Sequence, residues 1–264
     1  MRDDDRYDDD YEDRPRRRSS GGGGGTVLLI LGIVGGVILL IGGGLALLLI
    51  PAVAKVRDAA SRVQSMNNMK QMALGFDNQM SQQGYIEPAI MSKDGKPLLS
   101  WRVAILPYVE QDNLYRQFKL NEPWDSAHNK PLLGQMPRIY AHTWVTDGTS
   151  NTHYRVFVRG GAMFEYGKKT RFAAQKPDEI GISDGASNTI EIVEAAQAVP
   201  WTKPEELDFN PNGVLPALGV PGKNMVNIAM ADGSVRAHDL KNLNPVTLKA
   251  AITANGGEVL PAEW

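Results

Sequence analysis

Hydrophobic residues are most concentrated between Thr26 and Ile50, a run of 25 residues without a charged side chain. A helix of this length measures roughly 37 Å, which exceeds the ~30 Å hydrocarbon core of a bilayer. The apolar core of a secretory signal peptide is shorter, at ~7–15 residues. The pattern therefore predicts a single transmembrane helix over residues 26–50. Cleavage at an Ala-x-Ala-like site within residues 51–54 is the alternative.

After Pro51 the pattern becomes amphipathic. Apolar residues recur at steps of three or four, which is typical of one face of a helix. The apolar positions are Val53, Val56, Ala60, Val63, Met66, Met69, Ala73, Phe76 and Met80, and the opposite face carries Lys55, Arg57, Asp58, Arg62, Gln64, Asn67, Asn68 and Lys70. We predict an amphipathic helical stalk over residues 51–83, whose second half packs on a globular body. A Met-rich stripe can also form a binding surface.

The remaining residues, 84–264, mix short helical and strand-like segments and predict an α+β body. Helices are expected within 101–118 (broken at Pro107), at 129–136 and at 246–254. Strands are expected at 155–158, 189–193, 226–230 and 234–237. The last two form a hairpin because Asp232-Gly233 lies between them. Asn255-Gly256-Gly257 is expected to end the last helix, and residues 258–260 to form a closing strand.

Charge is concentrated before the apolar run. Residues 1–20 hold six Arg and eight Asp or Glu, and a Gly-rich linker follows. No core forms from such a composition, so residues 1–25 are expected to be a disordered tail, either solubilising or a binding arm. Four Arg precede the span, against Lys55 and Arg57 after it. The positive-inside rule then predicts a cytoplasmic N-terminus and an extracytoplasmic body, in a single-pass protein of the cytoplasmic membrane.

The overall composition excludes several classes of partner and chemistry. The chain has 28 Lys and Arg against 30 Asp and Glu, a net charge of -2. This balance gives no attraction to nucleic acid, so the expected partners are the lipid bilayer and envelope proteins. Cysteine is absent, which excludes disulfides, thiolate metal ligands and cysteine nucleophiles.

Two similar segments, TDGTSNT at 146–152 and SDGASNT at 183–189, carry the turn chemistry of Asp, Gly, Ser and Asn. We interpret five residues as structural turn residues: Asp184, Gly185, Asn188, Asp232 and Gly233. Their oxygens also make Asp184 and Asp232 weak candidates for a Ca²⁺ site. Neither segment has the spacing of a Ca²⁺ loop, and no other cofactor is predicted.

Candidate catalytic residues are few, and we predict no enzyme. The four histidines, His128, His142, His153 and His238, lack the spacing of metal ligands. Glu191 and Glu194 alternate with apolar residues, which predicts that they lie on the solvent side of a half-buried strand. Three tryptophans, Trp124, Trp144 and Trp201, are expected to pack in the core or an interface, with a ligand groove as the alternative.

Four segments occur in an order that resembles a known family. They are LLLIPAVAKVRDAASRVQSMNNMKQMALGFDNQ (47–79), KDGKPLLSWRVAILPYVEQDNLYRQFKLNEPWDSAHNKPLL (93–133), DGASNTIEIVEAAQAVPWTKPEELDF (184–209) and VNIAMADGSVRAHDL (226–240). The chain resembles the pilin-like envelope proteins of planctomycete-type bacteria grouped as domain of unknown function fifteen fifty-nine. The resemblance implies a type IV pilin-like or pseudopilin-like shape, in which one long N-terminal helix lies against an antiparallel sheet. It implies no established enzymatic activity.

The chain departs from the family's pattern at two places. The start at Gly25-Thr26 has no Glu five residues after it or elsewhere in the span, and the resemblance ties that Glu to prepilin cleavage and assembly. We therefore expect no cut at Gly25. Gly222 stands ten residues before Asp232, where family members often carry a His.

These observations favour a non-catalytic, membrane-anchored envelope protein whose pilin-like body makes protein–protein contacts in a secretion or surface assembly. The alternative is a ligand- or Ca²⁺-binding envelope module that uses the Asp-Gly loops or the segment Trp201–Pro204. A hydrolase without a visible motif is the less favoured third hypothesis.

Overall fold

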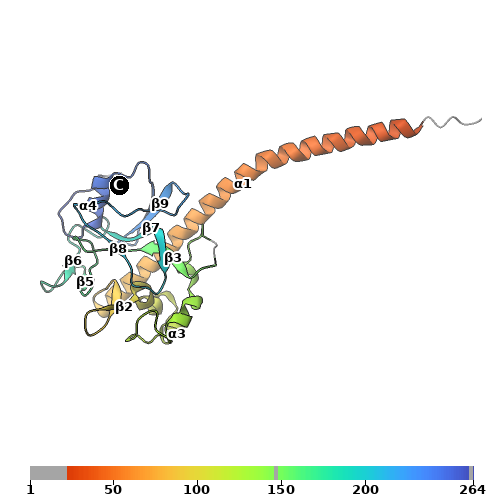
Figure 1. The fold of residues 1–264 in the computed structure, drawn as a ribbon. Coiled ribbons are helices and arrows are strands. Elements are labelled where there is room, and N and C mark those ends of the chain that lie inside the picture. Colours follow the sequence, from red (N-terminus) through yellow and green to blue (C-terminus); the bar gives the residue numbers. More distant parts are fainter. Residues whose placement is uncertain (1–22, 146–147, 262–263) are drawn as a thin grey trace, which may run out of the picture. The chain divides into compact units, whose positions relative to one another are not determined.

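A computed structural model describes residues 23–145, 148–261 and 264 (Figure 1). The chain divides into two compact units, Met1–Lys55 and Val56–Trp264. Residues 1–22 of the predicted disordered tail lie outside the described residues. So do residues 146–147, which belong to the first of the two similar Asp-Gly segments.

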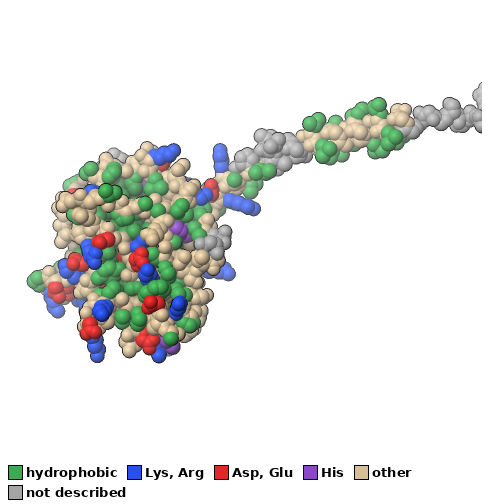
Figure 2. All heavy atoms as spheres, viewed as in Figure 1, with side chains coloured by type: hydrophobic (Ala, Val, Ile, Leu, Met, Phe, Trp, Pro, Cys, Tyr) green, Lys and Arg blue, Asp and Glu red, His purple; other side chains and the backbone are tan. Residues whose placement is uncertain are grey.

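Helix α1 (Gly23–Gln83) begins within the Gly-rich linker, three residues before the predicted start at Thr26. Its apolar side chains between Val27 and Leu40 are mostly exposed, and Figure 2 shows green hydrophobic atoms on this part of the helix. In the part of the chain that the structure describes, no helix combines the length and the apolar character needed to span a membrane. The side chains of residues 41–49, which belong to the predicted span, lie outside that description.

The second unit is built around a four-stranded antiparallel sheet with the order β10-β9-β7-β3. The strands are β3 (Asn151–Arg155), β7 (Ile190–Pro200), β9 (Met225–Met230) and β10 (Val235–Asp239). This mixture of helix and antiparallel sheet confirms the predicted α+β class. Three small sheets accompany it: β1 (Ala89–Met91) with β2 (Pro97–Ser100), β4 (Phe157–Val158) with β8 (Leu207–Asp208), and β5 (Thr170–Arg171) with β6 (Ile180–Gly181).

The other helices are short. They are α2 (Trp101–Ala104), η1 (Leu106–Val109), α3 (Asp112–Tyr115), η2 (Lys130–Gln135), η3 (Arg138–Tyr140) and α4 (Pro245–Ile252). The predicted helical segment after Trp101 is thus divided into three short helices, and Pro107 lies in the first turn of η1, where its missing N–H is tolerated.

Two predictions for the C-terminal segment are wrong. The last helix is capped at Thr253 rather than at Asn255-Gly256-Gly257, and residues 258–260 form no strand. Ala254 N donates to Gly161 O, so the chain leaves the helix to join another segment. The N–H groups of Gly256 and Gly257 are then bound by the Asp184 carboxylate instead of by helix carbonyls.

Two hydrophobic clusters cover the two faces of the central sheet. One joins Met72 and Phe76 of α1 to Ile192 of β7. The other joins Val193 of β7 to Leu248 of α4. Strand β7 is therefore buried on both faces, because a helix packs on each.

Burial on both faces overturns the prediction for Glu191 and Glu194. Both were expected on the solvent side of a half-buried strand, but their exposed fractions are only 2% and 0%. The alternation of polar and apolar residues cannot distinguish a strand with a solvated face from a central strand whose polar side chains have buried partners. A register shift between Ile190 and Ile192 further interrupts the alternation.

The buried face of α1 also differs from its apolar stripe. Met69, Met72, Phe76 and Met80 are buried, and we predicted packing for this half of the stalk. Asn68, expected on the solvated face, is only 8% exposed and is therefore a correction. Val53, Val56 and Val63 of the predicted stripe are exposed.

The turn between β9 and β10 requires a left-handed backbone at Gly233, where φ is 76°. Its N–H donates to Met230 O at 2.9 Å, and Asp232 Oδ1 accepts from Ser234 N at 2.9 Å. A Cβ at this glycine would meet only Asp77 Oδ2, at 3.9 Å, so the constraint lies in the backbone angle rather than in space.

Gly233→Val is expected to lower the free energy of unfolding by about 1–3 kcal/mol, because a β-branched residue is strained in this conformation. Gly233→Asn is the matched control and should cost less, since Asn tolerates the left-handed region. Thermal unfolding followed by circular dichroism measures both. Equal stability of the Val variant and the parent chain would contradict the argument.

Candidate functional site

A buried carboxylate, that of Glu194 on β7, joins three parts of the body. Its Oε1 accepts hydrogen bonds from Ser65 Oγ on α1, from His142 Nε2 at 2.8 Å and from Asn227 Nδ2 on β9 at 2.9 Å. Its Oε2 accepts from Asn227 N at 2.7 Å. The Ser65 hydroxyl in turn lies 2.8 Å from Tyr154 OH on β3. We call these five residues the Glu194 cluster.

The connectivity of the Glu194 cluster differs from that of a catalytic triad. In a triad the histidine lies between the hydroxyl and the carboxylate, so that it can take the hydroxyl proton. Here the carboxylate lies between Ser65 and His142, and both donate to it. Trp144 N donates to the other ring nitrogen, His142 Nδ1, at 3.3 Å, which fits the tautomer with the proton on Nε2. The arrangement suits attachment of α1 to the sheet rather than activation of Ser65.

The pKa of Glu194 reflects two opposing effects. Burial alone would raise the pKa, but the hydrogen bonds that His142, Ser65 and the Asn227 N–H donate to the carboxylate outweigh burial and hold the pKa below its usual value. The carboxylate is therefore ionised in the folded protein. Its contribution to stability is present above the unfolded-state pKa and is lost as the pH falls toward the folded-state pKa.

Glu191, three residues earlier on the same strand, has the opposite environment. Burial, together with the carboxylates of Asp77 and Asp232, raises the pKa of Glu191 well above its usual value. Its Oε2 has no hydrogen-bond partner among the described residues. Because the pKa of Glu191 is higher in the folded than in the unfolded chain, folding becomes less favourable as the pH rises above the unfolded-state pKa.

A buried ion pair, separate from the Glu194 cluster, connects the loops beside the sheet. Arg102 on α2 binds Glu206 through both ends of its guanidinium, at 2.9 and 3.3 Å, and both side chains are fully buried. Arg102 also donates to Tyr154 O and Ser100 Oγ, and Glu206 accepts from Val156 N at 2.9 Å. With each charge supplied with several partners, this pair serves a structural role.

The two weak metal candidates occupy turns. Both oxygens of Asp184 accept backbone N–H groups, those of Gly257 and Gly256, at 2.9 and 2.8 Å. These N–H dipoles favour an anion there and oppose a cation. Asp232 Oδ1 caps Ser234 N, and Asn188 Nδ2 donates to Asp184 O at 3.0 Å. Gly185 has a φ of 94°. The described residues contain no group of three acidic or histidine side chains placed to hold a metal ion.

The predicted tryptophans do not form a common groove. Trp201 is fully buried and stacks on Tyr140 at 5.6 Å between ring centroids. Trp124 lies under Lys203, and Trp144 lies beside His142 and under Lys223. The histidines are also dispersed. His128 binds Gln117 O, His153 binds Ala195 O and packs on His142, and His238 lies elsewhere.

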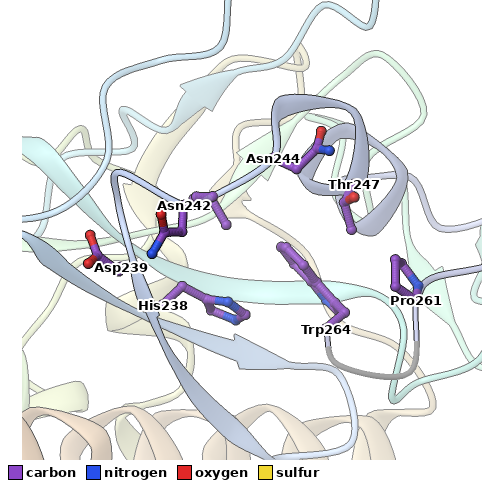
Figure 3. Close-up of a pocket in the computed structure, with 8 residues that line it drawn as sticks. His238, Asp239, Asn242, Asn244, Thr247, Pro261 and Trp264 are labelled. Carbon is purple, nitrogen blue, oxygen red and sulfur yellow. The ribbon is translucent and has the colours of Figure 1, made fainter.

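His238 lines a pocket of about 260 Å³ between the end of β10, the start of α4 and Trp264 (Figure 3). Its ring stacks on Trp264 with 4.6 Å between the ring centroids. Figure 3 shows Asp239 and Asn242 on the side of His238, with Asn244 and Thr247 across from them. The described residues that line it are His238, Asp239, Asn242, Leu243, Asn244, Thr247, Pro261 and Trp264.

Two nitrogens of the pocket are buried without a hydrogen-bond partner among the described residues, His238 Nε2 and Trp264 Nε1. Burial and the charge of Arg236 lower the pKa of His238, so the imidazole is neutral at neutral pH. The Arg236 guanidinium donates to Trp264 O at 2.9 Å and to Ser187 O at 3.0 Å. These bonds position Trp264 over the end of β10.

Sequence reasoning missed this pocket. Asn242, Asn244 and Thr247 form no motif, and Trp264 is 26 positions beyond His238. One signal was present. Asn244 precedes Pro245 at the start of the last helix, where an N-cap residue is expected, and its Oδ1 accepts from Val246 N at 2.8 Å. That signal predicts the cap but not the cavity beside it.

Comparison with known families gives one match. Residues 54–141 match the family described as "Protein of unknown function (DUF1559)". The matched segment contains Ser65 and Arg102, which take part in the two buried networks, but it ends before the pocket. No curated protein and no solved structure matches the chain.

Substitutions at the two buried glutamates of β7 are expected to have opposite effects. Glu194→Gln should lower the free energy of unfolding by about 2–4 kcal/mol, because an amide NH₂ would replace an oxygen that accepts buried N–H groups. Glu191→Gln should raise it by about 1 kcal/mol, because the amide is neutral without having to take up a proton. Urea unfolding followed by tryptophan fluorescence measures both.

The pH dependence separates these effects from general damage to the strand. Both differences from the parent chain should be largest near about pH 7 and shrink toward about pH 4, where free glutamate begins to protonate. A destabilised Glu191→Gln variant, or a difference independent of pH, would show that the assigned charge states are wrong.

Proposed function

Because the family that residues 54–141 match is described only as of unknown function, we propose a function from the geometry of the chain itself. We propose that it is a non-catalytic envelope protein, anchored in the cytoplasmic membrane by residues 26–50. Its pilin-like body, in this proposal, lies outside the cytoplasm and makes protein–protein contacts in a secretion or surface assembly.

The observation that carries the proposal is that α1 changes from an uncharged, apolar segment to an amphipathic segment along its length. Residues 26–50 are uncharged, and the described side chains from Val27 to Leu40 expose most of their apolar surface. Transfer of each such side chain from water to an apolar environment is favourable by about 1.5–3 kcal/mol of free energy. An apolar surface that extends around a helix favours a lipid environment.

The second half of α1 makes polar contacts with the body. Ser65 donates to the Glu194 carboxylate, and Thr143 Oγ1 donates to Ser61 O at 2.7 Å. These polar contacts, the first buried and the second partly buried, fix the helix register against the body, since a shift by one residue would remove them. A helix that is fixed to a body at one end and apolar at the other is suited to anchoring.

Support for protein contacts comes from two features. A helix packed on an antiparallel sheet is the shape that the resemblance to pilin-like proteins implies. In addition, Gly32, Gly35 and Gly36 have open space at their Cβ positions, so a second helix can approach their backbone closely. The carboxylate-centred connectivity of Ser65, Glu194 and His142 supports the non-catalytic part of the proposal.

Charges placed in the apolar half of α1 test the anchor. The double variant Ile38→Lys, Leu39→Lys is expected to leave the carbonate-washed membrane fraction, because each lysine costs about 2.5–3.5 kcal/mol at the centre of a span. The control, Val53→Lys with Val56→Lys, places the same charges on exposed positions beyond residue 50 and should remain in that fraction. Equal distribution of the two variants would contradict anchoring by residues 26–50.

Single cysteines test the orientation, since the chain has none of its own. Val214 is 96% exposed on the body, whereas Ser19 precedes the span. In spheroplasts, a membrane-impermeant maleimide is expected to label Val214→Cys and to spare Ser19→Cys until the membrane is permeabilised. Labelling of Ser19→Cys alone would reverse the proposed orientation.

The same variant tests the protein contacts. A thiol-linked photo-crosslinker on Val214→Cys should join the body to neighbouring envelope proteins or to a second copy. A body that remains uncrosslinked from this site and from Asn67→Cys would contradict the protein-contact part of the proposal.

A further inference from the structure

The pocket beside β10 has the dimensions and chemistry of a small-ligand site. We propose that it binds a neutral sugar ring, as a monosaccharide or as the terminal residue of a glycan. Its volume of about 260 Å³ is slightly below the roughly 300–1,000 Å³ of pockets that take drug-sized ligands, which favours a ligand of one ring. This site lies outside the family-matched residues and is independent of the proposed anchor.

The polar lining matches a ring that carries several hydroxyl groups. Asn244 uses its Oδ1 to cap α4, and Asp239 uses its Oδ1 to accept from Lys241 N at 2.9 Å. The Asn244 NH₂ group and Asp239 Oδ2 have no hydrogen bond within the described part of the chain. With the Asn242 amide and the Thr247 hydroxyl, they offer both donors and acceptors around one space.

The aromatic lining residues match the face of a sugar ring that presents C–H bonds. The C–H bonds on one face of a pyranose ring carry small positive charges, and the face of an indole ring is negative. Trp264 stacks on His238 through one face, with an interplanar angle of 28°. One indole ring among polar lining groups suits a sugar, whereas a flat aromatic ligand gains most from two parallel aromatic faces.

The charge of the lining disfavours phosphates and other anions. The described residues that line the pocket include no Lys or Arg. The nearby Arg236 is held by the carbonyl oxygens of Trp264 and Ser187. Within the described lining only Asp239 has a carboxylate side chain, so an anionic ligand would meet repulsion there without a compensating cation.

The two unpartnered nitrogens point to a hydroxyl as well. Trp264 Nε1 can only donate a hydrogen bond, whereas His238 Nε2 donates or accepts according to its tautomer. A hydroxyl group both donates and accepts, so it can pair with either nitrogen. Both nitrogens are covered in this structure, and contact with a ligand requires a shift of the Trp264 ring.

Saturation-transfer NMR on the full chain in lipid nanodiscs, without glycoside detergents, tests the proposal. The probes are glucose, galactose, mannose and N-acetylglucosamine, with adenosine monophosphate and phenylalanine amide as aromatic alternatives. We expect transfer to at least one sugar, with a dissociation constant in the millimolar range. Trp264→Ala and Asn242→Ala should each weaken binding by about tenfold or more.

Val246→Ala is the matched control, because Val246 lies on α4 next to Thr247 but is exposed and outside the lining. It should bind as the parent chain does. Thermal unfolding shows whether each variant is folded, and Trp264→Phe, which keeps an aromatic face, should retain binding if Trp264→Ala unfolds. The proposal is overturned by absence of transfer to every sugar, by binding of only the aromatic probes, or by parent-like affinity in Asn242→Ala or in a folded Trp264→Ala.

Discussion

The buried carboxylate of Glu194 is the constraint on which the arrangement of the body depends. A carboxylate with no access to water is stable only when donors surround it. Here the donors come from α1, from the segment after η3 and from β9. Any packing that separates one of these elements from β7 leaves a buried charge with too few partners. Hydrophobic contacts supply the attraction between α1 and the sheet, and the carboxylate selects one register among those that would bury similar area.

The buried ion pair of Arg102 and Glu206 constrains the loops in the same way, because each buried charge needs its partners. It joins α2 to the segment before β8 and to the backbone of Tyr154 on β3. Tyr154 also contacts Ser65, so the two networks meet at one residue of β3. Buried ion pairs add little net stability compared with apolar residues of the same size. Their contribution here is to specify which segments meet.

Rigid polar networks and the pocket occupy different parts of the body. The Glu194 cluster and the Arg102–Glu206 pair involve α1, α2 and the segments between β3 and β9, and their charged groups have hydrogen-bond partners within the protein. The pocket lies at β10 and α4, where two nitrogens lack partners within the described residues. In a folded protein, unsatisfied polar groups are expected at positions that contact something other than the protein. At β10 and α4 the unpartnered nitrogens lie beside a pocket, which supports a binding role there, whereas the buried ionic groups of the first region have partners and support a structural role.

The sequence by itself determined the elements that depend on local pattern. The helical repeat of Met69, Met72, Phe76 and Met80, the β9–β10 hairpin at Asp232-Gly233 and the α+β class follow from periodicity and turn chemistry, which act over a few residues. The uncharged run at 26–50 is likewise a property of the sequence alone.

Tertiary structure decided what depends on contacts between distant segments. Glu191 and Glu194 have similar sequence surroundings, yet one faces other carboxylates and the other faces hydrogen-bond donors. Asn68 is buried because of what lies against α1, and residues 258–260 form no strand because Asp184 and Gly161 bind the preceding residues. The pocket required His238 and Trp264 to meet from separate segments. Local sequence patterns do not specify such long-range contacts, because the neighbours of a side chain depend on the fold of the whole chain.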